Sequence, residues 1–167
     1  MIDSEQLKNL FPRENEIPEE HRPPEPIHQR SYLIDGVLKP WEGASQTVLS
    51  PVCIRRENGE LEQVELGSYP LGEEAQSEEA LEAAVAAYDN GRGEWPTMTV
   101  AERIACVQEF TRQMVAQKRQ VVSLIMWEIG KNLTDSEKEF DRTVDYIRAT
   151  IEALKELDNS NSRFVEV

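Results

Sequence analysis

The sequence predicts a mostly helical fold in which four helices follow two N-terminal β-hairpins. The dipeptides Asp35-Gly36 and Asn58-Gly59 each lie between apolar runs, a pattern typical of tight hairpins. From Ser77 onward the apolar period changes from two residues to about three and a half, which indicates amphipathic helices. The 167 residues are enough for about one domain with a buried core.

The first 30 residues differ in composition from the rest of the chain. A segment rich in proline and charge buries too little apolar surface to offset the entropy lost on ordering. We therefore expect residues 1–30 to form an extended proline-rich arm outside the core, and residues 31–167 to form the domain. The prolines of the arm are Pro12, Pro18, Pro23, Pro24 and Pro26.

The strands are predicted from turn chemistry. Residues 32–38 form the first hairpin, because a type I′ turn at Asp35-Gly36 needs positive φ at both central residues. Residues 52–66 form the second hairpin around Asn58-Gly59. Between the hairpins, residues 47–49 are expected to form a further strand that Pro51 ends.

The first two helices are predicted from their caps. Ser77 is the expected N-cap of the first helix, which ends at Asn90-Gly91. Thr99 and Glu102 form a capping box that opens the second helix. Residues 91–96 are expected to form a loop between them. The first helix gathers on one face Leu81, Ala84, Val85 and Tyr88, and the second carries Ile104, Val107, Thr111, Met114 and Val115.

The third and fourth helices complete the prediction. Residues 121–129 are apolar almost all round, which for a helix means burial on most sides. Gly130 suits the left-handed position that ends this helix. Residues 134–137 form the expected cap of the fourth helix, which runs to about Asp158.

The fourth helix carries two apolar stripes. Arg142 lies about 160° from the centre of the first stripe, on the side of the second. A helix with two stripes is expected to be covered on both sides, so a downstream domain or a second copy of the chain is expected as a partner. The alternative is that the alanines simply favour helix and that Tyr146 lies flat on the surface. The first stripe is Phe140, Val144, Ile147, Ile151 and Leu154, and the second is Tyr146, Ala149, Ala153 and Leu157.

Composition limits the function classes. The formal net charge of -14 repels phosphate backbones and anionic membrane surfaces, so no nucleic-acid or membrane partner is expected. The only two cysteines are far apart and fit neither a disulfide framework nor a zinc site. No apolar run approaches the roughly 18 residues of a membrane span, and the start of the chain lacks the features of a signal peptide. These features predict a cytoplasmic protein.

No catalytic residue and no metal ligand is predicted within the chain. Cys106 lies among apolar residues of a helix, where a cysteine is usually a small buried hydrophobe, and Cys53 lies in a predicted strand. His21 and His28 belong to the arm, with no Asp or Ser in a fixed relation. The sequence also contains no glycine-rich nucleotide-binding motif.

Two motifs resemble a known family. The run Met126-Trp127-Glu128-Ile129-Gly130-Lys131 closes the third helix, and Glu139-Phe140-Asp141-Arg142-Thr143 follows in the fourth, with Gly93-Glu94-Trp95-Pro96 upstream. In this order they resemble the N-terminal part of the aldehyde dehydrogenase superfamily, from about Tyr32 to Val167. Within the superfamily the two motifs are most similar to the NADP-dependent, non-phosphorylating glyceraldehyde-3-phosphate dehydrogenases.

The resemblance implies an aldehyde dehydrogenase-like α/β fold of which residues 31–167 form the leading, incomplete part of the coenzyme-binding domain. It implies an oligomeric enzyme in which a cysteine thiolate attacks the aldehyde, hydride passes to NADP, and a glutamate-activated water releases the thioester as an acid. The family's catalytic and nucleotide-binding residues match no position of this chain. The chain alone is therefore expected to be inactive and to bind no NADP.

One functional residue carries over from the resemblance. In the glyceraldehyde-3-phosphate branch an arginine followed by threonine on this helix helps to hold the substrate phosphate, and the matching residue is Arg142. A guanidinium offers a fork of donors to phosphate oxygens. The alternative is that Glu139 or Asp145 pairs with Arg142 along the helix, without any ligand. A second hypothesis for the whole chain is a non-catalytic helical interaction module that forms homodimers through its long C-terminal helix.

Overall fold

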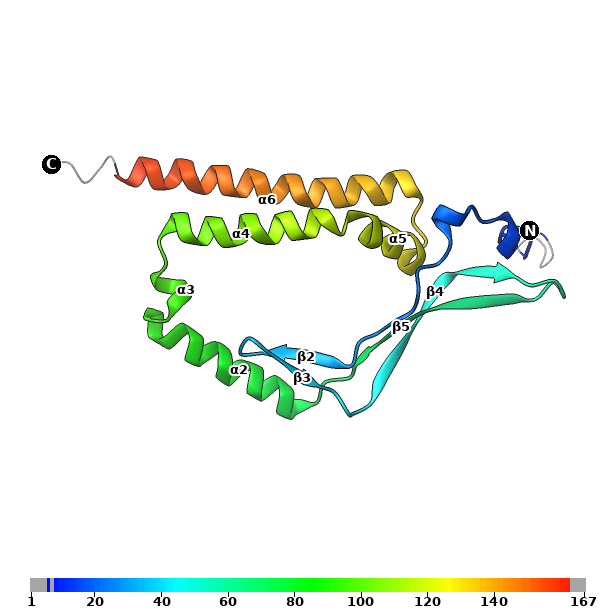
Figure 1. Ribbon diagram of the computed structural model, residues 1–167, viewed down its shortest axis with the longest axis horizontal. Helices are drawn as coiled ribbons and strands as arrows, with labels where there is room; N and C mark the ends of the chain where they lie inside the picture. Colours follow the sequence, from blue (N-terminus) through cyan, green and yellow to red (C-terminus); the bar gives the residue numbers. More distant parts are fainter. Residues whose placement is uncertain (1–5, 7, 163–167) are drawn as a thin grey trace. The chain divides into compact units, whose positions relative to one another are not determined.

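The computed structural model describes residue 6 and residues 8–162, and divides the chain into two compact units (Figure 1). The first unit contains the described residues up to Tyr32, together with Leu38–Gly72 and Arg119–Glu137. The second unit contains Leu33–Val37, Glu73–Lys118 and the described residues from Lys138 onward. Each unit is described by itself below.

The described part of the N-terminal segment contributes to the core of the first unit. It forms two 3₁₀ turns, η1 (Glu14–Glu16) and η2 (Glu19–His21), and a short strand, β1 (Ile27–His28). Ile17, between the two turns, is 8% exposed and belongs to the core cluster. The expectation that this segment stays outside the core is therefore wrong at Ile17, because a single apolar side chain is enough to anchor a proline-rich segment. The division into an arm and a domain stays a prediction.

The two predicted hairpins are confirmed. Strands β2 (Ser31–Ile34) and β3 (Val37–Pro40) pair with each other. Their turn has φ of 52° at Asp35 and 71° at Gly36, as a type I′ turn requires. Strands β4 (Ser45–Arg55) and β5 (Leu61–Pro70) pair antiparallel in a sheet of order β1-β5-β4.

The separate strand predicted at residues 47–49 is instead the first part of β4. Pro51 does not end this strand, because the β4–β5 register shifts between Leu49 and Cys53, and Pro51 lies inside that irregular stretch. A residue without a backbone N–H is tolerated in a bulge on an edge strand, and β4 is an edge of the sheet.

Helix α5 (Lys118–Ile129) closes the core of the first unit. Trp127 is 5% exposed and its Nε1–H donates to the carbonyl oxygen of His21 at 3.1 Å. Gly130 has φ of 66°, which confirms the predicted left-handed end of the helix. The buried members of the core cluster are Ile17, Ile54, Leu66 and Trp127.

Ser50 joins the sheet to α5. Its side chain is fully buried, and its hydroxyl donates to the carbonyl oxygen of Trp127 and accepts from the backbone N–H of Val52 at 3.0 Å. The backbone carbonyl of Ser50 accepts from Gln63 Nε2 at 3.1 Å. The bulge at Pro51 therefore leaves the polar groups around Ser50 hydrogen-bonded, as buried polar groups must be.

In the second unit, helix α2 (Glu74–Tyr88) begins earlier than predicted. Its N-cap is Glu73, whose backbone N–H donates to Gln76 Oε1 at 2.9 Å, and the Ser77 hydroxyl donates back to the Glu73 carbonyl at 3.3 Å. Ser77 is therefore inside the first turn of the helix and is not its N-cap. No residue of α2 is buried.

The predicted loop at residues 91–96 contains helical turns. The short element η3 (Asp89–Gly91) follows α2, and α3 (Glu94–Thr97) is a single helical turn. Pro96 is tolerated in this turn because the first residues of a helix have no intrahelical acceptor for their N–H groups.

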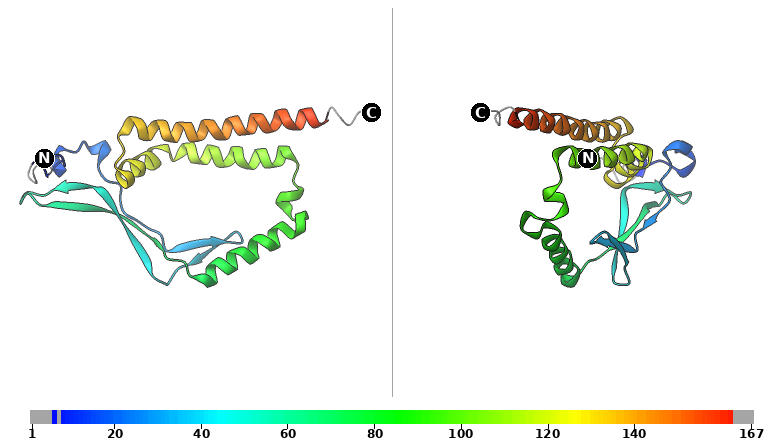
Figure 2. Two further views of the ribbon diagram at one scale, coloured as in Figure 1. Left: turned by 180° about the vertical axis from the view of Figure 1, so that it is seen from behind. Right: turned by 60° about the vertical axis from the view of Figure 1, so that its left-hand side comes forward.

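Helices α4 (Val100–Ala116) and α6 (Leu133–Ser162) run antiparallel and side by side (Figures 1 and 2). The predicted capping box of α4 is confirmed, since the Glu102 N–H donates to Thr99 Oγ1 at 3.3 Å and the Thr99 N–H donates to Glu102 Oε2 at 2.8 Å. Lys118 Nζ contacts Asp141 Oδ1 at 2.6 Å at the end of this helix pair. The four predicted helices are thus found as α2, α4, α5 and α6.

Candidate functional site

Helix α6 carries the predicted site, and the sequence sets its first turn through Asn132. The Asp135 N–H donates to Asn132 Oδ1 at 2.9 Å, and the Ser136 hydroxyl donates to the Asn132 carbonyl at 2.8 Å. The helix therefore begins one residue after Asn132, and the predicted cap at residues 134–137 is wrong by two residues. An asparagine side chain can cap in the same way as serine or threonine.

The first stripe of α6 is confirmed as the buried face of the helix. Phe140 is 2% exposed, Val144 4% and Ile151 7%, while Ile147 and Leu154 are half-buried. Because these residues recur every three or four positions, one face of the helix is held against the rest of the protein. This fixes which residues of α6 can reach a ligand or a partner.

Arg142 is exposed. The alternative of an ion pair along the helix is not supported at Asp145, because Arg148 Nη1 lies 3.6 Å from Asp145 Oδ1. Arg142 forms no ion pair within the described part of the chain. Its guanidinium is therefore able to receive an anion.

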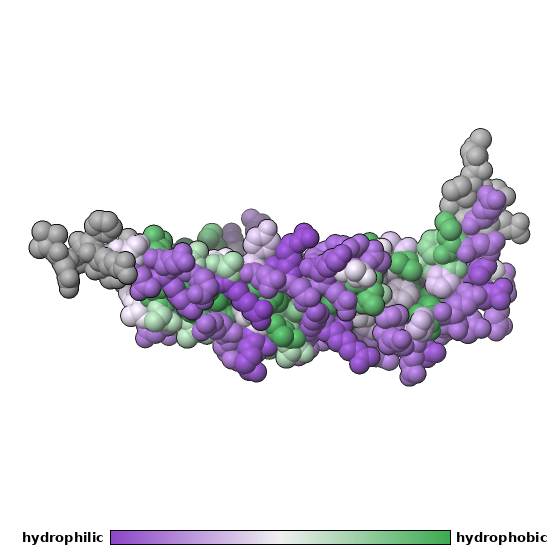
Figure 3. All heavy atoms as spheres, turned by 90° about the horizontal axis from the view of Figure 1, so that it is seen from above, coloured by the Kyte–Doolittle hydropathy of each residue, from purple (hydrophilic) through white to green (hydrophobic). Residues whose placement is uncertain are grey.

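The second stripe of α6 is exposed. Tyr146 is 69% exposed and Leu157 57%, and Ala149 and Ala153 are exposed as well. The described residues do not cover this stripe. Figure 3 shows the side of the molecule on which α6 lies. Most of this surface is hydrophilic, and hydrophobic side chains appear on it only in separate patches.

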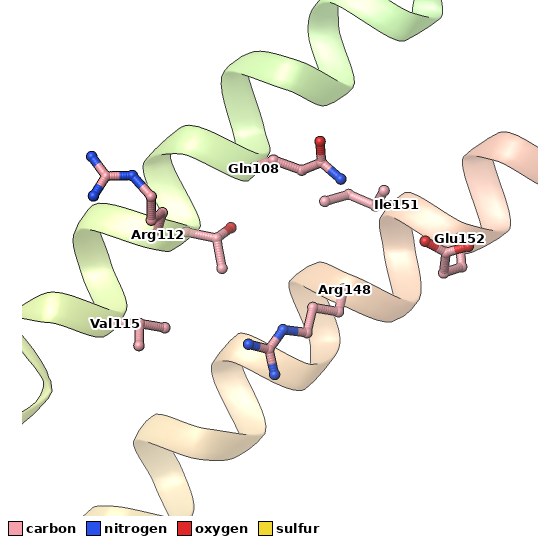
Figure 4. Close-up of a pocket in the computed structure, with 7 residues that line it drawn as sticks. Gln108, Arg112, Val115, Arg148, Ile151 and Glu152 are labelled. Carbon is pink, nitrogen blue, oxygen red and sulfur yellow. The ribbon is translucent and has the colours of Figure 1, made fainter.

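A hollow of about 340 Å³ lies on one side of the seam between α4 and α6 (Figure 4). Gln108 and Ile151 reach toward each other across it, and the Arg112 guanidinium points away from it. Arg112 Nη2 pairs with Glu109 at 2.7 Å, and Glu152 pairs with Lys155 at 2.8 Å. Because these charges are satisfied by neighbours on the same helix, the hollow offers little to a charged ligand.

A second groove of about 490 Å³ lies between α4 and α6. Thr143, the residue after Arg142, lines this groove. The other residues of α6 in the lining are Tyr146, Ile147, Thr150, Ile151 and Leu154. Arg103 on α4 also lines it, and the Arg103 Nε is buried with no hydrogen-bond partner among the described residues. Sequence reasoning missed Arg103, because its importance depends on burial that the helical pattern does not reveal.

The Trp127–Lys131 run is a structural junction. Trp127 belongs to the core, and Gly130 ends α5. A pocket of about 390 Å³ is lined by N-terminal residues such as Glu16 and His21 together with Met126, Trp127, Gly130, Lys131 and Asn132. The run therefore packs within the first unit, and its contacts there are those of a core residue and a helix end.

The cysteines and histidines form no catalytic arrangement. Cys106 is exposed, so the expectation that it is a buried hydrophobe is wrong; its position falls on the outer face of α4. His28 Nδ1 lies 3.1 Å from Ser68 Oγ and 4.0 Å from Glu65 Oε1. A catalytic relay needs the serine and the carboxylate on different ring nitrogens, so this contact is not one.

The contact of His28 with Ser68 was missed because the pairing of β1 with β5 was not predicted. The two residues are direct partners in that parallel pairing. Within the described ranges, no group of three or more His, Cys, Asp or Glu side chains could hold a metal ion. No helix among the described residues is long and apolar enough to cross a membrane.

The glycine pair Gly91 and Gly93 is closely packed. The one glycine pair before a helix, Gly91 and Gly93, precedes the single turn α3. A Cβ at Gly93 would lie 1.7 Å from the carbonyl oxygen of Ala87, so this glycine allows close packing of the chain on itself. A nucleotide-binding turn would instead leave its glycine backbone open to a phosphate.

A comparison of the sequence with models of known protein families gave a match. The model of the aldehyde dehydrogenase family matches residues 55–165, which is more than half of the chain and includes both resembling motifs. Neither the comparison with curated proteins nor that with solved structures gave a match. The chain belongs to the aldehyde dehydrogenase family.

Proposed function

We propose that this chain is the leading part of an NADP-dependent aldehyde dehydrogenase that oxidises glyceraldehyde 3-phosphate to 3-phosphoglycerate through a cysteine thioester. In this proposal Arg142 holds the substrate phosphate. The observation that carries it is the exposed Arg142 guanidinium, which has no ion pair within the described part of the chain although carboxylates lie on the same helix. An arginine without a protein partner can give its donors to a phosphate.

The chain itself supplies the supporting layer and no catalytic group. Residues 31–167 form the leading part of an aldehyde dehydrogenase-like coenzyme-binding domain, and the nucleophile, general base and NADP site belong to other parts of the enzyme. The chain alone oxidises no aldehyde and binds no NADP. The two free cysteines favour a reducing compartment such as the cytoplasm.

The test is a comparison of substrates in the enzyme that contains this chain. Arg142→Ala raises the KM for glyceraldehyde 3-phosphate by at least about tenfold and leaves the KM for unphosphorylated glyceraldehyde nearly unchanged, since a lost charged hydrogen bond costs about 1.5–3 kcal/mol. Arg148→Ala is the matched control, because Arg148 is an exposed arginine of the same helix that already pairs with Asp145. Equal effects of Arg142→Ala on both substrates would remove Arg142 from the phosphate site.

A second candidate function is a non-catalytic interaction module that forms homodimers through α6. The exposed Tyr146 and Leu157 of the second stripe favour it. Light scattering on the isolated chain tests this: Leu157→Ser, at a residue that does not line the α4–α6 groove, converts such a dimer to a monomer. A wild-type chain that is monomeric at all concentrations would argue against this function and leave the enzyme proposal intact.

A further inference from the structure

We propose that a cavity between the N-terminal segment and the β4–β5 hairpin binds a small hydrophilic anion that carries a diphosphate group. The cavity has a volume of about 840 Å³, which is usual for a small-molecule site. All of its lining residues belong to the first unit, whereas Arg142 belongs to the second, so the proposal does not rest on the proposed function. The arginines that line the cavity are Arg13, Arg22, Arg55 and Arg56.

The N-terminal segment and the end of β4 bring these arginines together (Figures 1 and 2). Arg13 and Arg55 are partners in an isolated parallel bridge, and the Arg55 N–H donates to the Pro12 carbonyl at 2.9 Å. Partners in a bridge carry their side chains on the same face, so two positively charged side chains are neighbours here. Like charges at paired positions are destabilising, and an anion bound beside both of them reduces that cost.

Arg56 is the arginine whose charge the protein itself compensates. Its Nε lies 2.6 Å from Glu62 Oε2, and its Nη1 lies 3.0 Å from Glu14 Oε2. The pair with Glu14 also neutralises one of the two carboxylates that line the cavity. Arg56 is therefore part of the wall, and the proposed ligand uses the other three arginines.

Arg55 is held in place but is compensated only weakly. Its side chain is 18% exposed, and its Nη1 donates to Asn9 Oδ1. Its ion pair with Glu16, from Nη2 to Oε2, is 3.9 Å long, which is too long for a hydrogen bond. The charge of Arg55 is therefore still able to attract an anion in the cavity.

Arg13 and Arg22 have no ion pair within the described part of the chain, and both are exposed. Arg13 is the residue before η1, and Arg22 is the residue after η2. They stay unpaired although both turns contain glutamates. Because a guanidinium offers a fork of N–H donors to a phosphate, these two arginines and Arg55 form a three-sided set of donors.

The chemistry of the lining selects the class of ligand. All lining residues are polar or charged, so the cavity offers no apolar wall to an aromatic or aliphatic group. The three available arginines lie in three different places of the chain, so their donors approach from different directions. A carboxylate accepts hydrogen bonds close to its own plane, whereas the terminal oxygens of a phosphate point in tetrahedral directions. Two linked phosphates also provide enough acceptors for three forks.

Glu57 gives the proposal a prediction of opposite sign. It is the second carboxylate of the lining, and no ion pair to it is found among the described residues. Its negative charge opposes an anion in the cavity. Glu57→Gln is therefore expected to strengthen the binding, whereas removal of a cavity arginine is expected to weaken it.

The test is isothermal titration of the 167-residue chain with inorganic pyrophosphate at about 0.15 M salt, where distant charges are largely screened. We expect one pyrophosphate to bind per chain. Arg13→Gln and Arg22→Gln are each expected to weaken the affinity by about tenfold or more, because each removes a charged hydrogen-bond donor. Glu57→Gln is expected to strengthen it severalfold. Arg30→Gln is the matched control, since Arg30 is an exposed arginine of the same segment outside the lining, and its affinity is expected to equal that of the wild type.

Circular dichroism checks that each variant keeps the fold, which substitutions at exposed residues are expected to preserve. Absence of pyrophosphate binding to the wild type overturns the proposal. An Arg22→Gln effect no larger than that of Arg30→Gln also overturns it, as does weaker binding by Glu57→Gln. Citrate that binds as tightly as pyrophosphate would overturn the assignment to phosphates.

The same titration of the enzyme that contains this chain shows whether the cavity stays accessible there. Pyrophosphate is expected to bind with the affinity found for the isolated chain, and Arg22→Gln is expected to weaken it to the same extent. Loss of binding in the enzyme would overturn the proposal, because the cavity would then be covered by other parts of that protein.

Discussion

Helix α5, which carries Trp127, and helix α2 both have apolar residues at helical spacing. The residues around Trp127 are buried, whereas the apolar face of α2 is exposed. Trp127 is 5% exposed, and Ile17, Ile54 and Leu66 from three other segments cover it. Leu81 on α2 is 66% exposed. The difference does not come from the residues of the two helices, since both have apolar faces. It comes from the segments around them, which cover α5 and, among the residues that the structure describes, leave α2 exposed.

The comparison of α5 with α2 shows that the apolar pattern of a helix and the burial of that helix are separate properties. The pattern indicates which face of a helix is apolar, but it does not indicate what covers that face. In the first unit the cover includes Ile17, from a segment whose composition indicates an exposed arm. For α2 the described residues provide no such cover, and none of its residues is buried.

The largest expected effect on stability is at the buried Trp127. Trp127→Ala leaves a cavity and removes the hydrogen bond to His21, so the free energy of unfolding is expected to fall by about 3–5 kcal/mol. Leu81→Ala, at an exposed position, is expected to change it by less than about 0.5 kcal/mol. Urea denaturation of both variants measures the difference. Equal losses would show that α2 is packed as firmly as α5.

A smaller effect on stability is expected at the N-termini of α4 and α2 in the second unit. Thr99→Ala removes the hydroxyl that caps α4, and about 1 kcal/mol of stability is expected to be lost with it. Ser77→Ala is expected to cost only a few tenths of a kcal/mol, because Ser77 is inside α2 and Glu73 is the N-cap. Thermal unfolding of the two variants provides the comparison, and a larger loss for Ser77→Ala would restore it as the cap.

The smallest effect concerns the exposed surface of α4. Hydrogen bonds from Arg112, and then from Gln113, lower the pKa of Glu109 from 4.5 to about 2. The folded pKa lies below the unfolded one, so the contribution of this carboxylate to stability is present above pH 4.5 and is lost as the pH falls toward 2. An NMR titration of Glu109 is expected to show the lowered pKa, and Arg112→Ala is expected to bring it back toward 4.5. A wild-type Glu109 that titrates near 4.5 would show that the pair does not persist in solution.

Local chemistry made much of the fold predictable. The Asp35-Gly36 turn, the capping box at Thr99 and the left-handed Gly130 each depend on a few neighbouring residues, and the structure confirms all three. The course of β4 through Pro51 was not predictable, because it depends on Ser50 hydrogen bonds to Trp127, far away in sequence. The start of α2 was missed because a glutamate, a weaker N-cap than serine, takes that position.

Of the candidate site, only the residue that matches a family pattern could be predicted from the sequence. Arg142 was found through its match to that pattern, and its exposure on α6 is compatible with the predicted role without testing it. Arg103 was not predictable, since nothing in the order of residues marks an arginine whose Nε is buried without a partner. Likewise, the contact of His28 with Ser68 depends on a two-residue strand that no periodicity reveals.

Amide hydrogen exchange on the chain tests most directly the claim that α5 is covered and α2 is not. The account predicts that amides of α5 and β5 exchange with protection close to that of global unfolding. The amides of α2 are predicted to exchange orders of magnitude faster, because an isolated helix of 15 residues is marginal in water. Protection of α2 equal to that of α5 would contradict the account, since it would require a cover that the described residues do not provide.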